Sequence, residues 1–242
     1  MTARDHYKNH LAHFYAWMLG DFEERQNTQL DFFARNNILP GASNVAIDLG
    51  AGNGLQSISL ARLGFSVVAV DFNKQLLDEL LTRKQELPVS MILDDIISFI
   101  NSYDQVAEVI VCMGDTITHL ESISHVEQLL EKISDRLTPD GKVIISFREL
   151  LRELKGEERF IPVRNDETRI LTCFLEYFPN HVMVHDILHE WESDKWIQKV
   201  SYYPKLRLGE TFITTTLERY NIKTISAERI SGMLYMVGQK IS

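Results

Sequence analysis

The residues best placed to do chemistry lie in a glycine-rich segment, Val45–Gly54, and at an aspartate seventeen residues later, Asp71. Gly50, Gly52 and Gly54 let the backbone pass close to a ligand, because no Cβ intrudes and positive φ is accessible. Asp71 ends a second apolar run, where a carboxylate can accept both hydroxyls of a ribose. The order strand, glycine turn, helix, strand and carboxylate predicts the first half of a nucleoside-binding α/β fold.

The spacing of the glycines indicates which nucleoside cofactor this segment suits. Dinucleotide-binding turns carry G-x-G-x-x-G, whereas these glycines run G-x-G-x-G and Leu55 occupies the last fingerprint position. Asp48 stands two residues before the first glycine, where a carboxylate suits an ammonium group better than a pyrophosphate. S-adenosylmethionine offers a ribose, an ammonium, a carboxylate and a cationic sulfur, and no phosphate.

The string Asp-x-Gly-x-Gly-x-Gly, followed by a strand that ends in Asp, resembles the first two motifs of class I S-adenosylmethionine-dependent methyltransferases. The resemblance implies S-adenosylmethionine as the cofactor. The alternative, an NAD-dependent oxidoreductase, is disfavoured by Leu55.

Length, charge and cysteine content exclude several classes of protein. The 242 residues suffice for one α/β domain with an insertion, and 45% of them are hydrophobic. No apolar run reaches the roughly 18 residues of a membrane span, and the N-terminus lacks the apolar region of a secretion signal. A net charge of −9 without a Lys/Arg cluster argues against nucleic acid and favours a small-molecule substrate. Cys112 and Cys173 lie far apart in apolar runs and are expected to be reduced thiols of a cytoplasmic protein.

Alternating strand-like and helix-like segments predict a doubly wound, Rossmann-like α/β fold with a mostly parallel seven-stranded sheet. Two amphipathic helices are expected within residues 4–37. The expected strands of this sheet span residues 45–49, 66–70, 89–93, 106–113, 142–147, 223–229 and 234–239. Helices are expected over residues 54–63, 73–85, 123–137 and 209–220.

Three segments of period two, over residues 169–177, 181–192 and 195–203, predict an inserted three-stranded antiparallel meander. The expected organisation is a single domain over residues 1–242. It comprises an N-terminal helical cap (4–40), a cofactor-binding half (45–150), the inserted strands (165–206) and a closing helix with strands (207–242). The cap and the meander are expected to close over the substrate and exclude water.

Acidic residues follow the third expected strand. Asp94 and Asp95 lie at the carboxyl edge of the sheet, where open α/β folds bind ligands. In methyltransferases an acidic residue here commonly meets the adenine amino group, with the next backbone N–H, here that of Ile96, at a ring nitrogen. The alternative role is an N-cap for the following helix, and the sequence does not choose between Asp94 and Asp95. Residues next to these motifs are expected to complete the cofactor contacts, namely Ala51, Phe72, Cys112 and Met113.

Two further strands end in polar residues at the same edge. Val111–His119 leaves the fourth strand where the methyl group and the acceptor are expected, and Arg148 ends the fifth. A guanidinium can hold a substrate carboxylate through two parallel N–H donors. The alternative for Arg148 is an ion pair with Glu149 or another surface carboxylate.

A closer resemblance covers most of the chain. Gly114–Leu120, Ser146–Arg148 and Val200–Pro204 are similar in order and spacing to glycine N-methyltransferase and related amine methyltransferases. Tyr15–Asp21, continued to Arg25, resembles the entry segment of that family.

This resemblance implies site roles for five residues. Tyr15 and Arg25 would contact the cofactor, Arg148 would clamp a substrate carboxylate, and Tyr202 or Tyr203 would line the methyl-transfer site. Two positions depart from the family. Asp115 replaces an Asn and Met18 replaces a pocket Tyr, which argues against glycine itself as the acceptor.

The expected activity is N-methylation of a small polar acceptor, an amine or an amino-acid-like molecule. His119 or Asp115 could remove the amine proton, although the chemistry requires neither. The alternative function is a non-catalytic sensor of S-adenosylmethionine or S-adenosylhomocysteine. The oligomeric state is not determined by the sequence.

Three histidines at residues 181, 185 and 189 share one face of an expected strand. Met183, Ile187 and Trp191 lie on that same face, and no cysteine or acidic residue repeats the pattern. A mixed exposed or interface face is therefore expected, and no metal site is predicted.

Overall fold

The computed structural model describes residues 1–241, which fold as two compact units. The meander unit comprises residues 1–20 and 150–207. The Rossmann-like unit comprises residues 21–149 together with the chain from Leu208 onward. The chain therefore passes from one unit to the other three times. The predicted single-domain organisation, with its inner boundaries, stays a prediction.

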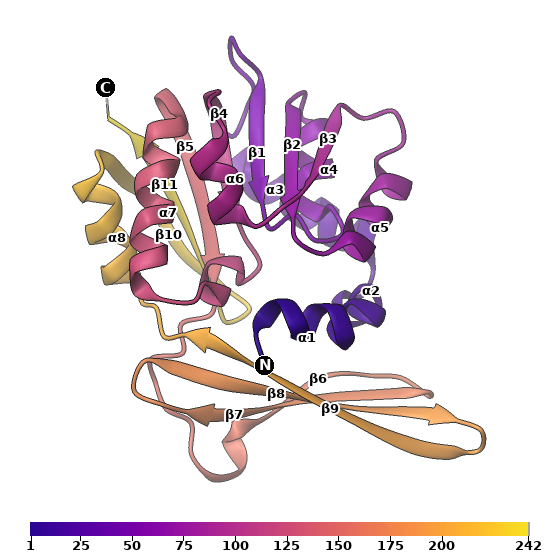
Figure 1. Ribbon diagram of the computed structural model, residues 1–242. Coiled ribbons are helices and arrows are strands. Elements are labelled where there is room, and N and C mark those ends of the chain that lie inside the picture. Colours follow the sequence, from indigo (N-terminus) through magenta and orange to yellow (C-terminus); the bar gives the residue numbers. More distant parts are fainter. Residues whose placement is uncertain (242) are drawn as a thin grey trace. The chain divides into compact units, whose positions relative to one another are not determined.

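The Rossmann-like unit contains a seven-stranded sheet in the order β10-β11-β5-β4-β1-β2-β3 (Figure 1). Five neighbouring strands, β3, β2, β1, β4 and β5, pair in parallel, and β11 is antiparallel to β5. β10 is antiparallel to β11 and therefore runs in the same direction as those five. This confirms the predicted fold class. The strands are β1 (Val45–Leu49), β2 (Ser66–Asp71), β3 (Val89–Leu93), β4 (Ala107–Cys112), β5 (Leu137–Phe147), β10 (Ile222–Ile230) and β11 (Met233–Lys240).

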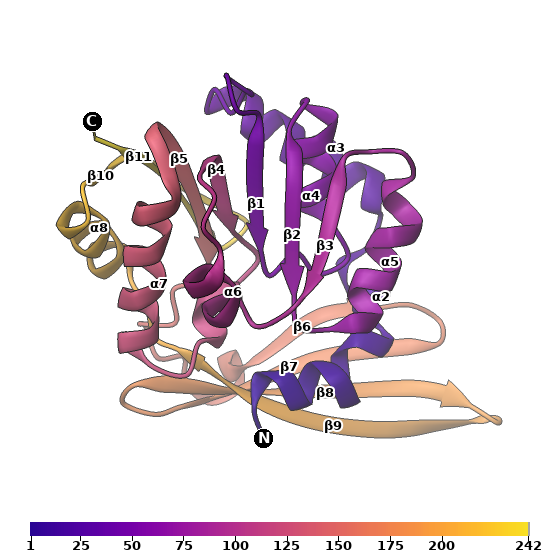
Figure 2. The same cartoon turned by 45° about the horizontal axis from the view of Figure 1, so that its top comes forward.

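Helices cover both faces of this sheet (Figure 2). On one face lie α3 (Phe22–Arg35), α4 (Leu55–Arg62) and α5 (Lys74–Lys84). Their side chains Phe33, Leu60 and Leu80 are buried in one cluster with Val67 and Val111 of the strands. On the other face lie α6 (Ile96–Ser102), α7 (Ile123–Arg136) and α8 (Glu210–Arg219). No helix within residues 1–241 has the length and apolar character needed to cross a bilayer.

Two predictions about individual elements are wrong: the number of N-terminal helices and the start of β5. The N-terminal stretch forms three helices instead of two, α1 (Ala3–Asn9), α2 (Tyr15–Leu19) and α3, with a 3-10 turn, η1 (Leu11–His13), after the first. The break before α3 arises because Gly20 adopts φ +89° and the Asp21 side chain then accepts a hydrogen bond from the Glu24 N–H at 2.8 Å. β5 begins at Leu137 instead of Lys142, because the sheet absorbs the Pro-Asp-Gly sequence as an irregularity between Leu137 and Lys142.

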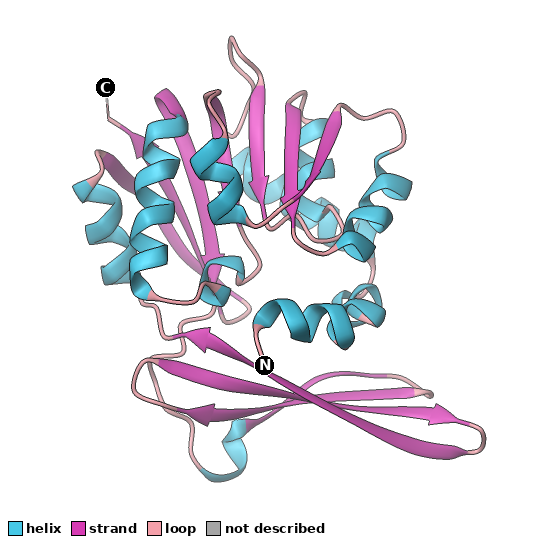
Figure 3. Ribbon diagram, viewed as in Figure 1, coloured by secondary structure: helices cyan, strands magenta, loops and turns pink. Residues whose placement is uncertain are grey.

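The meander unit contains a four-stranded antiparallel sheet in the order β6-β7-β8-β9 (Figure 3). The strands are β6 (Phe160–Asn165), β7 (Arg169–Tyr177), β8 (His181–Glu192) and β9 (Lys195–Leu206). The prediction of three strands is therefore wrong. The missed strand, β6, contains Pro162 and is interrupted by a bulge before Arg164. A proline is tolerated there because β6 is an edge strand, but it weakened the sequence pattern.

One face of this four-stranded sheet packs on the N-terminal helices. Leu171 of β7 and Leu188 of β8 form a buried cluster with Leu11 and Phe14. The same face carries a buried polar network that ties α1 to the sheet. The two ring nitrogens of His6 lie 3.0 Å from Asp186 Oδ2 and 2.8 Å from Ser201 Oγ. All three side chains are buried, so this network contributes to the core of the unit.

Candidate cofactor and substrate site

The glycine loop after β1 lies at the carboxyl edge of the parallel strands. The backbone N–H groups of Gly50 and Ala51 both donate to the Val70 carbonyl, at 2.8 and 2.9 Å. Gly50, Gly52 and Gly54 have φ values of +80°, +53° and +94°. A Cβ on Gly50 would lie 2.4 Å from Thr116 Cγ2, and one on Gly54 would lie 2.2 Å from Leu80 Cδ1. The loop therefore needs glycine for both its conformation and its close packing.

Asp71 ends β2 beside this loop, and its side chain is buried. One carboxylate oxygen accepts the Gly52 N–H at 2.8 Å, and the other accepts the Asn73 N–H at 2.7 Å. The carboxylate thus ties the end of β2 to the glycine loop and to the start of α5. Phe72, the next residue, is half-buried. Ribose binding by Asp71 stays a prediction.

Asp48 lies within β1 and is 1% exposed. The Ser57 hydroxyl of α4 donates to its Oδ2 at 2.6 Å. Burial raises the pKa of the Asp48 carboxyl to about 7, and the charge of nearby Asp71 adds to the rise while the Ser57 hydrogen bond opposes it. The side chain therefore joins β1 to α4, the helix that follows the glycine loop. Its contact with an ammonium group stays a prediction.

The two aspartates after β3 have different partners. Asp95 caps α6, because its Oδ1 accepts the N–H groups of Ile97 at 2.9 Å and Ser98 at 3.3 Å. Asp94 accepts the Asp95 N–H at 2.7 Å, and its own N–H donates to the Asp71 carbonyl at 3.1 Å. The capping alternative therefore applies to Asp95. Ile96 is buried, and the adenine contact of either aspartate stays a prediction.

Asp115 and Arg148 form the charged pair of this edge. Asp115 has φ +76° at the exit of β4, and its side chain is 4% exposed. Its two oxygens accept the Arg148 backbone N–H at 2.7 Å and Arg148 Nη1 at 2.5 Å. The Arg148 side chain is 53% exposed. Arg148 thus forms an ion pair, but its partner is a buried aspartate and not Glu149 or another surface carboxylate, and Glu149 pairs instead with Arg229.

Arg25 belongs to α3 and is linked electrostatically to β11 through Tyr235. Tyr235 of β11 lies within electrostatic range of Arg25, Arg148 and Asp115. Burial raises the pKa of the Tyr235 hydroxyl, and the two arginines oppose that rise. Three predicted site residues, Arg25, Asp115 and Arg148, therefore act electrostatically on one tyrosine.

The remaining predicted residues of this unit lie along the exit of β4. Cys112 and Met113 are buried, and burial raises the pKa of the Cys112 thiol. His119 ends a short 3-10 helix, η2 (Thr116–His119), and is half-buried. Their predicted roles stay predictions.

The last three predicted residues belong to the meander unit. Tyr15 is half-buried at the start of α2. Tyr203 is buried, with its ring stacked on His6 at a centroid distance of 4.1 Å. Tyr202 is exposed and lies on the opposite face of β9 from Tyr203. The two alternatives for the transfer site thus have very different surroundings within their unit.

The chemistry of this edge fits a phosphate-free nucleoside. The backbone of three left-handed glycines forms a cradle. Four acidic residues, Asp48, Asp71, Asp94 and Asp95, lie at or next to the carboxyl ends of β1, β2 and β3. Carboxylates suit the hydroxyls of a ribose and an ammonium group, and they repel a pyrophosphate. The donor set therefore fits S-adenosylmethionine, with Asp71 and the Asp94–Ile96 turn as the groups that would hold the nucleoside.

Comparison with known proteins agrees with this chemistry. Residues 46–141 match the model of a methyltransferase domain. Residues 46–141 are a class I methyltransferase domain. The predictions of a class I S-adenosylmethionine-dependent methyltransferase, and of S-adenosylmethionine as its cofactor, are confirmed at the level of the family.

Curated relatives of this methyltransferase domain differ in their acceptors. A mitochondrial ubiquinone biosynthesis O-methyltransferase from Schizosaccharomyces pombe is 25% identical over 71% of this chain and 62% of its own length. A glycine/sarcosine N-methyltransferase from Aphanothece halophytica is 27% identical over 60% of this chain and 56% of its own length. The chain thus spans between half and two thirds of the length of these relatives.

Solved structures share the fold over nearly the whole chain. The CcbJ methyltransferase from Streptomyces caelestis superposes with a TM-score of 0.76 over 98% of both chains, at 16% identity. CalS10, an amino pentose methyltransferase from Micromonospora echinaspora solved with S-adenosylmethionine bound, gives a TM-score of 0.71 at 12% identity, covering 92% of this chain and 93% of its own. At these identities the similarity establishes the fold.

Sequence reasoning missed four residues of the Rossmann-like unit that support this edge. Ser57 donates to Asp48, Thr116 packs on Gly50, and the Ser146 hydroxyl accepts the Gly114 N–H at 2.9 Å. Tyr235 pairs with Ser146 across β11 and β5. Ser57 carried a readable signal, since it lies in the first turn of the helix that follows the glycine loop. The other three depend on contacts between distant segments.

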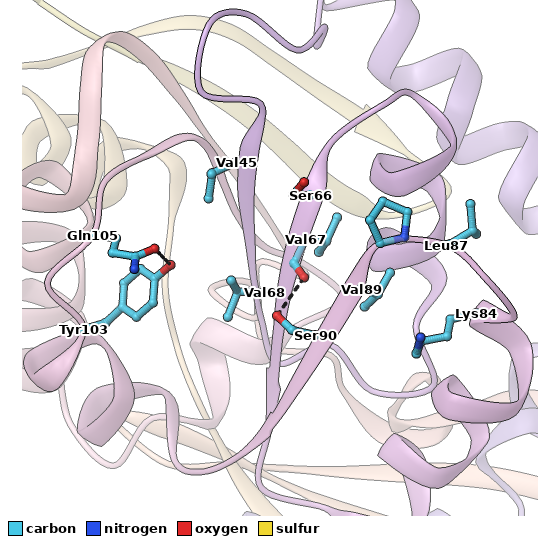
Figure 4. Close-up of a pocket in the computed structure, with 11 residues that line it drawn as sticks. Val45, Ser66, Val67, Val68, Lys84, Leu87, Val89, Ser90, Tyr103 and Gln105 are labelled. Carbon is cyan, nitrogen blue, oxygen red and sulfur yellow. Dashed lines mark hydrogen bonds between the residues drawn. The ribbon is translucent and has the colours of Figure 1, made fainter.

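A shallow pocket of about 440 Å³ lies elsewhere in the Rossmann-like unit (Figure 4). It is lined by the amino-terminal parts of β1, β2 and β3, including Val45, Ser66 and Val89, and by Tyr103. None of the predicted site residues lines it. Open α/β folds bind ligands outside the carboxyl ends of their strands, so the glycine-loop edge is the candidate site.

Proposed function

We propose that the protein transfers the methyl group of S-adenosylmethionine to the nitrogen of a small polar acceptor, an amine or an amino-acid-like molecule. The observation that carries the proposal is the pair of Asp115 and Arg148 at the carboxyl edge that also holds the glycine loop. The match to a glycine/sarcosine N-methyltransferase supports the choice of nitrogen.

Arg148 is the group proposed to recognise the acceptor. Asp115 holds Nη1, and the side chain is still half-exposed. The other guanidinium N–H donors are therefore available for a carboxylate in the planar, two-point geometry that arginine favours. The buried partner fixes the orientation of the guanidinium, which lowers the entropy lost when a substrate binds.

The proposed reaction is an in-line displacement. The cofactor, when bound, supplies an electrophilic methyl group on a sulfonium. A lone pair on the acceptor nitrogen forms the new C–N bond as the C–S bond breaks, and the nitrogen then loses a proton. Positioning can supply about 7–11 kcal/mol of the barrier reduction in such reactions.

Asp115 is proposed to position Arg148, since both of its oxygens accept hydrogen bonds from that residue. His119 is the proposed proton acceptor, while Tyr15, Arg25 and either Tyr202 or Tyr203 keep the contacts that the family resemblance implies. We include a cytoplasmic location and small-molecule acceptors in the proposal. The absence of a disulfide between Cys112 and Cys173 in the described chain supports the location, and the net charge of −9 supports small-molecule acceptors.

The test measures methyl transfer from labelled S-adenosylmethionine to matched acceptor pairs, each an amino acid and the amine that lacks its carboxylate. We expect transfer to nitrogen and a preference for the carboxylate-bearing member. Arg148→Lys should raise KM for that member at least tenfold and leave its partner amine unaffected. Transfer to oxygen, or equal use of both members by the wild type, would contradict the acceptor proposal. Cofactor binding without any transfer would instead favour the sensor.

A further inference from the structure

The sheet of the meander unit has a second face that no part of the described chain fills as a core. This outer face consists of the even-numbered residues 170–176 of β7 and 196–204 of β9 and the odd-numbered residues 183–191 of β8, which the strand register places opposite one another. Phe160 of β6 pairs with Phe174 and extends the outer face onto β6. The residues between them point to the other face, which packs on Leu11 and Phe14.

The outer face is apolar and exposed. Trp191 and Trp196, which pair directly across β8 and β9, are 46% and 43% exposed, and Val200 is 55% exposed. Ile170 and Phe160 are also exposed. Apolar patches of this extent are uncommon on monomers and mark interaction surfaces.

The charge of this face differs from that of the rest of the chain. Charged residues make up 24% of the sequence, and the net charge is −9. Among the outer-face positions defined above, Glu176 is the one charged residue, and it lies 3.1 Å from His185 Nε2. Arg159 borders the face, above the Phe174 ring at 4.7 Å. Removal of charges from the centre of a patch is the compositional mark of a protein interface.

This charge pattern indicates the kind of partner. A nucleic acid or an anionic membrane would require lysines and arginines, which the outer-face positions lack. Two copies of an acidic chain repel each other, unless they meet through a surface almost free of carboxylates. The outer face is such a surface, so a second copy of this chain is the partner that it suits.

The size of the face agrees with a dimer. β7, β8 and β9 contain 9, 12 and 12 residues. At about 3.3 Å per residue and 4.8 Å between strands, these three strands present a flat area of about 500 Å². Side chains that stand off the sheet raise the accessible area towards the about 800 Å² per partner of a standard interface.

We propose that the outer face is the interface of a homodimer. A two-fold axis would bring the same face of each copy together, and the two sheets would stack about 10 Å apart as in a β-sandwich. The histidines at positions 185 and 189, which share this face with Ile187 and Trp191, would then belong to the interface.

The test compares the solution mass of the full chain and its variants by light scattering after gel filtration. We expect the wild type at micromolar concentration to have twice the 28.0 kDa mass of the chain. Val200→Glu and Gln198→Glu each add a carboxylate near the centre of the face and should shift the midpoint of dissociation at least tenfold towards monomer. Leu81→Glu on α5, at a residue of similar exposure (53%), is the matched control and should remain dimeric.

Far-UV circular dichroism would establish that each variant is folded. Gln198→Glu changes a polar position, so it keeps the test valid if Val200→Glu fails to fold. A wild type that is monomeric at all concentrations would overturn the proposal. A dimer whose dissociation is unchanged by both outer-face variants, or equally weakened by Leu81→Glu, would overturn it too.

Discussion

Asp48 in the Rossmann-like unit and Asp186 in the meander unit are buried to the same degree, at 1% and 2% exposure. Their pKa values nevertheless move in opposite directions. Burial raises that of Asp48 to about 7, because only hydrogen bonds from Ser57 oppose desolvation and the charge of Asp71 adds to the rise. Burial acts on Asp186 as well, but hydrogen bonds from His6 and Cys173 and the charge of His6 outweigh it and lower the pKa. The partners of a buried carboxyl, more than its depth, therefore set its charge.

This difference separates two kinds of polar core. The Asp48 carboxyl, which precedes the cofactor loop, has a pKa near 7, so it gains or loses its proton within the neutral pH range. Asp186 instead belongs to the polar network that joins α1, through His6, to β8 and β9. The following predictions test this contrast, beginning with the largest expected effect.

His6→Leu should destabilise the meander unit by about 3–5 kcal/mol, because it leaves the Asp186 charge buried without its main partner. All three tryptophans, Trp17, Trp191 and Trp196, lie in this unit. Their fluorescence during urea unfolding therefore reports on it directly. His10→Leu is the matched control, because His10 Nε2 has no hydrogen-bond partner in the described part of the chain. Equal losses of unfolding free energy in His6→Leu and His10→Leu would show that the His6–Asp186 network does not stabilise the unit.

Asp48 should make the stability of the Rossmann-like unit depend on pH. Its folded-state pKa of about 7 lies above the ordinary 3.8, so the folded state binds the extra proton between these values. The free energy of unfolding should then fall as pH rises from about 4 to about 7, by up to about 4 kcal/mol. The measurement is the difference between wild type and Asp48→Asn across this range. Parallel curves would show that Asp48 does not titrate there.

Asp71→Ala should weaken S-adenosylmethionine binding by about 2–4 kcal/mol, since each charged hydrogen bond contributes roughly 1.5–3 kcal/mol. Titration calorimetry on the folded variant measures the loss. Asp78→Ala is the control, because that carboxylate pairs with Lys74 on the exposed side of α5. An unchanged affinity in Asp71→Ala would remove the ribose assignment.

Comparing Gly50→Ala with Gly114→Ala should separate the two costs of adding a Cβ in these loops, the strain of a positive φ and the clash with neighbouring side chains. Both glycines have positive φ, which costs an alanine about 1–2 kcal/mol. A Cβ at Gly114 meets open space, whereas one at Gly50 meets Thr116. Gly50→Ala should therefore lower the free energy of unfolding by more than Gly114→Ala does. Adding Thr116→Ala should recover part of the difference, and equal losses in the two single variants would contradict the packing account.

The sequence predicted the two regions unequally for a physical reason. Asp48, Gly50 and Asp71 lie in one continuous βαβ segment, where strand and helix periodicity place each residue. The partners of Arg148 and His6 come from distant segments, so spacing along the chain carried no signal for them. β6 was missed because Pro162 and its bulge break the period-two pattern. Tyr202 and Tyr203 could be named as alternatives, but their opposite faces required the register of β9.

The division of both units into separate stretches has a consequence for synthesis. His6 leaves the ribosome 180 residues ahead of Asp186 and 195 ahead of Ser201. At about 5–20 residues per second, the N-terminal segment waits roughly 10–40 s for the strands that receive it. The central sheet is delayed too, since β11 is made almost last yet lies between β5 and β10. During that interval Leu11, Phe14 and the open edge of β5 are the surfaces of the nascent chain that a chaperone would need to protect.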